Sequence, residues 1–85
     1  MASYKIVIKQ SVAKDLRPIP NKDVRRILNR IEQLAENPRL PGAEQLTGDI
    51  KYRIRQVNYR ILYTIEDEII TVTVVKVGHR LDVYR

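Results

Sequence analysis

Hydrophobic residues in the first half of the chain follow two different spacings, one in residues 4–9 and the other in residues 21–35. In residues 4–9, Tyr4, Ile6 and Ile8 occupy alternate positions, which predicts a half-buried β-strand. In residues 21–35 the apolar side chains recur at steps of three and four, which predicts an amphipathic helix. The apolar positions of this helix are Val24, Ile27, Leu28, Ile31, Leu34 and Ala35. The pattern therefore predicts a strand followed by a helix with one buried face.

Polar and proline residues set the expected ends of the helices. Ser11 is the expected N-cap of a short helix that runs to about Arg17, where Pro18-Ile19-Pro20 stops it. Asn21 is the expected N-cap of the long helix, and Asn37-Pro38 ends it, because proline disfavours helical backbone in the residue before it. Two helices joined by a proline-containing hinge are therefore expected.

The second half of the chain has the pattern of strands. Three runs rich in β-branched residues and tyrosine occupy residues 50–56, 59–65 and 69–77. Their connections, Val57-Asn58 and Glu66-Asp67-Glu68, are short and polar, which suits antiparallel hairpins. The whole pattern predicts a single α+β domain over residues 1–85, with an N-terminal strand and two helices packed on an antiparallel sheet of about four strands.

The charge balance indicates a polyanionic partner. Among 85 residues, 16 Lys and Arg outweigh 10 Asp and Glu, which gives a net charge of +6. A basic excess of this kind makes nucleic acid the first partner to test. The alternative is the ordinary surface charge that keeps a small domain in solution.

Composition also bears on the compartment. Cysteine is absent, so stability cannot come from disulfides, and a cytoplasmic protein is expected. The N-terminal residues have no apolar signal-peptide core, and the longest apolar-rich run, residues 69–75, is too short to span a bilayer. No membrane partner is expected.

The inventory of reactive side chains excludes several enzyme classes. With a single histidine, His79, the chain cannot build a two-histidine ribonuclease, and with two serines it offers little for a Ser-His-Asp hydrolase. Glu66-Asp67-Glu68 is more simply a solvated turn than a cation site, so no metal is expected. The three glycines stand apart and form no phosphate-binding loop, and no cofactor is expected.

Basic residues are the most informative candidates for function. Lys51, Arg53 and Arg55 alternate with apolar residues, so their side chains project from one strand face about 7 Å apart. That spacing matches successive phosphates along an RNA strand, whereas the simpler interpretation is a solvated strand face. Arg60 lies in the apolar run Tyr59-Arg60-Ile61-Leu62-Tyr63, where a cation needs a partner or a ligand.

From Tyr4 to Tyr84 the chain resembles the RelE family of bacterial toxin–antitoxin systems. The resemblance is carried by the order of elements and by short motifs, which are Asn37-Pro38, Leu46-Thr47-Gly48, Tyr52-Arg53-Ile54-Arg55, Tyr59-Arg60-Ile61-Leu62-Tyr63, Val77-Gly78-His79-Arg80 and Asp82-Val83-Tyr84. RelE-like toxins are ribosome-dependent ribonucleases that cut messenger RNA in the decoding site, and ParE-like toxins of the same superfold inhibit DNA gyrase. The resemblance implies a RelE-like fold, a cognate antitoxin, and the ribosome and messenger RNA as further partners.

The resemblance also implies a set of site residues, position by position. The catalytic set is Arg53, Arg55, Arg60, Arg80 and Tyr84, and the residues in support of RNA binding are Lys51 and His79. RelE-like nucleases often place lysines where this chain has Arg53 and Arg55. Arginine keeps the charge at these positions but cannot act as a neutral amine base.

The implied reaction is attack of a ribose 2′-OH on its own 3′ phosphate, which in principle needs no metal. Arg53, Arg55 and Arg60 suit the stabilisation of phosphoryl charge, because a planar guanidinium grips phosphoryl oxygens with two donors. Tyr84 is the expected general base, and Arg80 is expected to orient the phosphate near the leaving group. A packing role for Tyr84 and a structural role for His79 are the alternatives. Otherwise His79 is the reserve acid or base.

Three functions stay open on the sequence. The first is a ribosome-dependent endoribonuclease that an antitoxin neutralises, the second is a ParE-like non-enzymatic toxin that inhibits DNA gyrase, and the third is a plain RNA-binding module. The set of arginines with Tyr84 favours the first, because a gyrase binder does not need a phenol among phosphate-binding cations.

Overall fold

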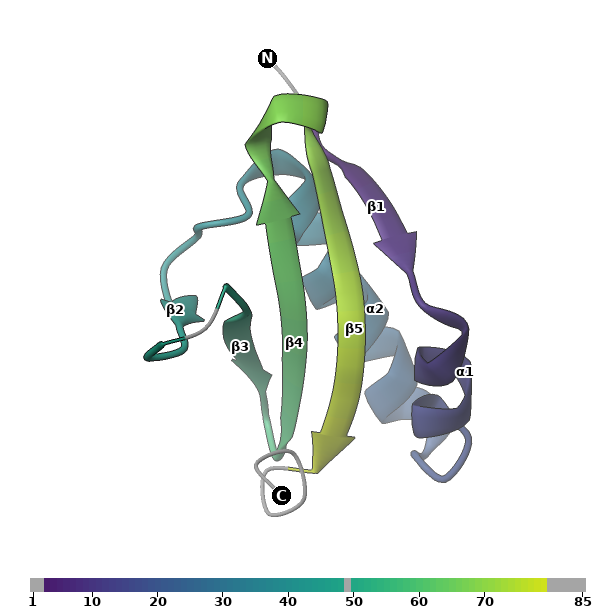
Figure 1. Cartoon of the computed structure of the whole chain (residues 1–85). Coiled ribbons are helices and arrows are strands. Elements are labelled where there is room, and N and C mark those ends of the chain that lie inside the picture. Colours follow the sequence, from purple (N-terminus) through teal and green to yellow (C-terminus); the bar gives the residue numbers. More distant parts are fainter. Residues whose placement is uncertain (1–2, 49, 80–85) are drawn as a thin grey trace.

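The chain folds into the expected succession of strand, helices and strands. The structure is a computed structural model, and it describes residues 3–48 and 50–79 (Figure 1). Its elements are β1 (Lys5–Ile8), α1 (Gln10–Leu16), α2 (Asn21–Glu36), β2 (Glu44–Gln45), β3 (Tyr52–Gln56), β4 (Tyr59–Glu66), the 3₁₀ turn η1 (Asp67–Ile69) and β5 (Thr71–His79). The α+β class, with two helices packed on a sheet, is confirmed.

The strands form one mixed sheet rather than an antiparallel one. Their order is β1-β5-β4-β3-β2, in which β1 runs parallel to β5 and the other neighbouring pairs are antiparallel. The expected sheet of about four antiparallel strands is therefore corrected in the direction of β1 and in the addition of β2, which has two residues. Alternation predicts a strand but not the direction of its partner, and two residues have no period to recognise.

Backbone geometry rather than a side chain begins both helices. α1 begins one residue before Ser11, and α2 begins at Asn21, so the N-cap positions belong to Lys9 and Pro20. The expectation that Ser11 and Asn21 cap the helices is therefore wrong. The carbonyl oxygen of Pro20 accepts a hydrogen bond from the backbone N–H of Asp23 at 2.9 Å. Because the proline ring fixes φ, Pro20 enters the helix without a side-chain cap.

Asn37-Pro38 ends α2 as predicted. The last helical residue is Glu36, and Asn37 Oδ1 accepts a hydrogen bond from the backbone N–H of Arg39 at 3.1 Å. The hydroxyl of Tyr63, in the middle of β4, donates to the carbonyl oxygen of Pro38 at 2.7 Å. Burial raises the pKa of Tyr63 to about 12. The loop after α2 is thus attached to the centre of the sheet.

The hydrophobic core lies between the helices and one face of the sheet. In Figure 1, α2 passes behind the sheet, and no helix of the described chain covers the opposite face. Of the predicted apolar stripe of α2, Ile27, Ile31 and Leu34 are buried. Val24 and Ala35 are partly buried, and Leu28 is 38% exposed. The core residues are Val12, Ile19, Ile27, Ile31, Leu34, Ile54, Ile61, Tyr63, Val72, Val74 and Val77. Full burial of one such aliphatic side chain contributes about 1.5–3 kcal/mol.

A group of polar side chains closes the end of the sheet where β4 turns into β5. Asp67 accepts hydrogen bonds from the Tyr4 hydroxyl at 2.6 Å and from both terminal nitrogens of Arg39, at 2.9 and 3.2 Å. The Arg39 guanidinium also lies 5.7 Å from the ring centroid of Tyr52. The hydrogen bonds from Arg39 and Tyr4 lower the pKa of Asp67 to about 2. We call Tyr4, Arg39 and Asp67 the Asp67 cluster.

Candidate nucleic-acid interface

Cations of β3 and β4 lie on the face of the sheet opposite α2, which we call the open face. Ile54 of β3 and Ile61 of β4 pair directly across the two strands and are fully buried on the core side. Because successive side chains of a strand point to opposite faces, Arg53 and Arg55 project from the open face. The predicted alternation of the basic strand is confirmed for the described residues of β3.

Arg55 and Arg60 face each other directly across β3 and β4. The connection is the two-residue hairpin turn at Val57-Asn58, in which Val57 has a φ of 56°. Arg55 is exposed, whereas Arg60 is half-buried and its Nε atom is buried. The two arginines line a hollow of about 90 Å³ together with Val57 and Tyr59. The register thus brings two guanidinium groups to one small hollow of the open face.

Arg53 has a carboxylate as its neighbour. The register places it opposite Glu44 of β2, and its guanidinium forms a hydrogen-bonded ion pair with the Glu44 carboxylate. The Arg53 side chain is 15% exposed and that of Glu44 is 64% exposed. A phosphate that approaches Arg53 must therefore compete with a carboxylate already in place. Sequence analysis missed Glu44, since β2 is too short for any periodic pattern.

The remaining predicted site residues are spread more widely. Lys51 is half-buried and lies one residue before β3, where its carbonyl oxygen accepts a hydrogen bond from the backbone N–H of Leu46 at 2.9 Å. Arg80 and Tyr84 lie outside the residues that the structure describes. The open face therefore brings together Arg53, Arg55 and Arg60 from the predicted set.

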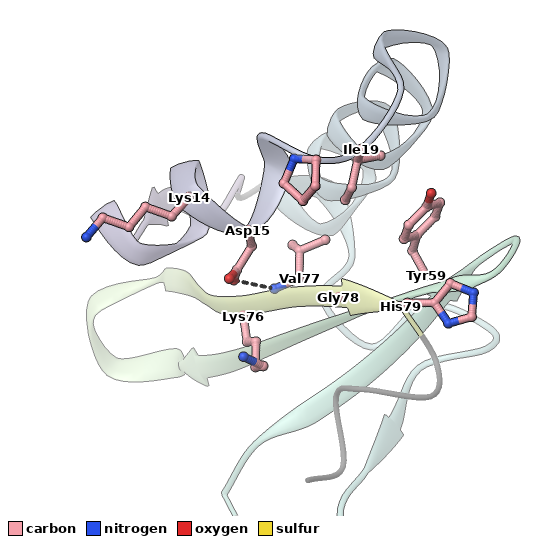
Figure 2. Close-up of a pocket in the computed structure, with 9 residues that line it drawn as sticks. Lys14, Asp15, Ile19, Tyr59, Lys76, Val77, Gly78 and His79 are labelled. Carbon is pink, nitrogen blue, oxygen red and sulfur yellow. Dashed lines mark hydrogen bonds between the residues drawn. The ribbon is translucent and has the colours of Figure 1, made fainter.

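His79 lies on the other face of the sheet. It pairs across the strands with Tyr59, and the two rings meet edge to face with centroids 6.0 Å apart. Both residues line a cavity of about 550 Å³ beside the hinge between α1 and α2 (Figure 2). On this side Asp15 Oδ2 accepts a hydrogen bond from the backbone N–H of Val77 at 3.1 Å. His79 is thus separated by the sheet from the arginine pair.

A further cation on the open face, Lys76, was not among the predicted residues. It pairs with Leu62 of β4, which in turn pairs with Arg53 of β3. The signal in the sequence was weak, because Lys76 is a single charge in the apolar run of residues 69–77 and its neighbours depend on the strand register.

The described residues offer little for metal binding. Within residues 3–48 and 50–79, no three or more histidine, aspartate or glutamate side chains come together to hold a metal ion. In the same part of the chain, no helix combines the length and the apolar character needed to cross a membrane. The acidic turn forms as a turn, and its central carboxylate is engaged in the Asp67 cluster.

The arrangement of two helices on one face of a five-stranded sheet matches the fold of solved toxins of the RelE/ParE superfamily. The model of the family described as "ParE toxin of type II toxin-antitoxin system, parDE" matches residues 6–84. The chain belongs to this family, and it is the toxin of a type II toxin–antitoxin system of the RelBE kind.

Similar proteins cover nearly the full chain. Toxin RelG of Mycobacterium tuberculosis is 29% identical over 86 residues, which span 96% of this chain and 97% of RelG. The toxin–antitoxin complex RelBE2 from the same species contains a chain with a TM-score of 0.84 and 27% identity, with 96% and 97% coverage. In the archaeal RelE–RelB complex from Pyrococcus horikoshii the TM-score is 0.78 at 26% identity, with 92% and 96% coverage.

Proposed function

We propose that this toxin is a ribosome-dependent endoribonuclease that cleaves messenger RNA in the ribosomal A site and so inhibits translation. The observation that carries the proposal is the pair of arginines, Arg55 and Arg60, that face each other on the open face. Two guanidinium groups in this register can donate to the same anion from neighbouring strands, and hydrogen bonds between charged groups are the strong ones. A phosphodiester of RNA is such an anion.

The chemistry assigned to this face is the attack of a 2′-oxygen on the adjacent phosphorus. The 2′-hydroxyl loses its proton, the new P–O bond closes a 2′,3′-cyclic phosphate, and the 5′-oxygen leaves with a proton. Arg55 and Arg60 stabilise the charge that develops on the phosphoryl oxygens, and donors of this kind commonly contribute about 10²–10³ in rate. Arg53 has the same role once a phosphate displaces Glu44.

Proton transfer is assigned by position in the family motif. Tyr84 is the proposed general base, and Arg80 orients the phosphate near the leaving oxygen. His79 lies on the opposite face from Arg55 and Arg60, so a part in proton transfer would require RNA to pass around the end of the sheet. This arrangement favours Tyr84 over His79 as the base.

A second candidate is inhibition of DNA gyrase without catalysis. The observation in its favour is the family model, whose description names ParE. A surface that binds a protein does not require two arginines to face each other, and it has no use for a general base. The endoribonuclease is therefore the preferred function.

One experiment separates the two candidates. The protein is incubated with messenger RNA in the presence and absence of programmed ribosomes, and new 5′ ends are mapped. We expect cuts at the A-site codon with ribosomes present, and much weaker cleavage of free RNA. A matched control is Lys22→Ala, which removes an exposed cation from α2 and leaves the open face intact. Wild-type protein that produces no cuts but inhibits gyrase supercoiling would establish the second candidate.

We also propose a cognate antitoxin that covers the open face with an acidic segment. Complementary charge suits this surface, since Arg55 and Arg60 lie side by side on it. Solved relatives of the chain are toxin–antitoxin complexes, which supports a partner of this class. The antitoxin is expected to be encoded beside the toxin gene, and co-expression of that neighbour should suppress toxicity. Toxicity that no neighbouring gene suppresses would contradict this proposal.

A further inference from the structure

Lys76 is aligned with the cations of β3 across the middle of the sheet. In the β4–β5 register Lys76 lies opposite Leu62, and in the β3–β4 register Leu62 lies opposite Arg53. Residues that pair directly across neighbouring strands project from the same face. Lys76 therefore projects from the open face, and Figure 2 shows its side chain on the opposite side of β5 from Asp15 and Ile19. Lys76 also borders the cavity that these two residues line.

In the next row of the sheet, the residue that β5 contributes is a glycine. This row reads Arg55, Arg60 and Gly78 across β3, β4 and β5. Gly78 has no side chain, so β5 contributes no side chain beside Arg60 on the open face. Lys76 precedes it by two residues, which places the two about 7 Å apart along β5 on the same face. Lys76 is thus the nearest side chain of β5 to Arg60 on this face, and Arg60 belongs to the proposed phosphate site.

Lys76 differs from Arg53, at the other end of the same row, because no carboxylate of the described chain neutralises its charge. Arg53 forms its ion pair with Glu44. Lys76 is exposed, and in the described part of the chain no carboxylate forms an ion pair with it. Strands lie about 4.8 Å apart, so Lys76 and Arg53 are separated by about 10 Å, with Leu62 between them. The row therefore ends in a cation available to a ligand at the β5 side.

We propose that Lys76 binds a phosphate of the RNA backbone adjacent to the phosphate held by Arg55 and Arg60. It is then a substrate-binding residue that fixes the direction of the RNA across β3, β4 and β5. Lysine suits this role because it is a compact charge on a flexible stem, which can follow a backbone phosphate without a fixed two-donor geometry. The proposal rests on the RNA-binding part of the proposed function and does not depend on cleavage.

The test measures binding of a short single-stranded RNA with 2′-O-methyl riboses, which cannot be cleaved by 2′-OH attack. The variants are Lys76→Ala and Lys76→Gln, with Lys76→Arg as the charge-conserving variant and Lys22→Ala as the control. Each phosphate contact to a single strand contributes about −0.7 to the slope of log K against log salt. We expect Lys76→Ala and Lys76→Gln to reduce the magnitude of the slope by about 0.7 and the low-salt affinity by about fivefold.

The controls make the result decisive. Lys76→Arg should keep the wild-type slope, and Lys22→Ala should change it little, because Lys22 lies on α2. Equal slopes for Lys76→Ala, Lys76→Gln and Lys22→Ala would overturn the proposal, as would a wild-type protein that does not bind RNA. So would weaker antitoxin binding at unchanged RNA affinity, which would assign Lys76 to a protein interface.

The same variants separate this inference from the proposed function. A slope that depends on Lys76, together with absence of ribosome-dependent cleavage, would support the inference and refute the endoribonuclease. Normal ribosome-dependent cleavage, together with a salt slope that does not depend on Lys76, would support the endoribonuclease and refute the inference about Lys76.

Discussion

The Asp67 cluster and the open face use arginine in opposite ways. In the Asp67 cluster, Arg39 donates two hydrogen bonds to one carboxylate, which a tyrosine hydroxyl also contacts. On the open face, Arg55 has another arginine directly opposite it. The first arrangement links the loop after α2 to the turn before β5 and stabilises the fold. The second places two guanidinium groups of neighbouring strands where both can donate to one anionic ligand. Ion pairing alone does not mark a structural arginine, because Arg53 of the proposed site is also paired, with Glu44.

The largest expected effect tests whether the open face performs chemistry or only holds RNA. Tyr84→Phe removes a phenolic oxygen and keeps the ring, so RNA binding should persist. Ribosome-dependent cleavage should fall by about 10²–10⁴, the usual contribution of a general acid or base. The wild-type rate should rise with pH because phenolate is the reactive form, and the variant should lose this rise. An unchanged rate and pH profile would show that Tyr84 is not the base.

Two arginine variants compare the regions directly. Arg55→Ala should lower the cleavage rate by about 10²–10³ because it removes a donor from the developing phosphoryl charge. Its melting temperature should stay the same or rise, since a repulsion is relieved. Arg39→Ala should leave cleavage unchanged and lower the melting temperature by about 2–5 °C. The test compares the cleavage rate and the melting temperature of each variant with those of the wild type. A loss of cleavage in Arg39→Ala alone would invert the assignment.

A smaller effect is expected for the Arg53–Glu44 ion pair, in which a residue of the proposed site has a carboxylate partner. Glu44→Gln removes the carboxylate that competes with phosphate for Arg53. RNA affinity at low salt should rise by about twofold to fivefold, and the salt dependence should become steeper by up to about 0.7. Titration of the uncleavable RNA checks both values, with Glu32→Gln on the exposed side of α2 as the control. A fall in affinity would mean that Glu44 positions Arg53 for binding.

The smallest effect concerns acid stability. The pKa of Asp67 is about 2 in the folded protein, below its ordinary value of 3.8. Its contribution to stability is therefore present above about pH 4 and is lost as pH falls from about 4 to about 2. Asp67→Asn should lower the melting temperature by about 2–5 °C at pH 7 and flatten the decline between pH 4 and pH 2. A variant with the wild-type acid profile would show that the cluster does not stabilise the fold.

Periodicity predicted most elements, and pairing between strands had to come from the structure. The apolar stripe of α2 and the alternation in β3 arise from local geometry, so the sequence reveals them. The parallel direction of β1 depends on contacts with β5, which is more than sixty residues away in the chain and leaves no local trace.

The site was predictable to the extent that it depends on local pattern. The arginines of β3 follow from alternation, and a two-residue turn brings Arg55 opposite Arg60. Glu44 was missed because its two-residue strand has no pattern. Lys76 was missed because its neighbours depend on an irregular register between Leu62 and Tyr63, where β4 shifts against β5.

The hydrogen bond from Val77 to Asp15 has a consequence for self-association. β5 extends past the last residue of β1, so among the described residues no strand pairs with its outer backbone from about Val75 to His79, and α1 packs there instead. Such an edge is a template for strand addition by a second molecule and hence for aggregation. The Asp15 carboxylate occupies the N–H of Val77 and places a negative charge against the edge. Asp15 of α1 therefore leaves this stretch of β5 with one N–H fewer for an added strand to pair with.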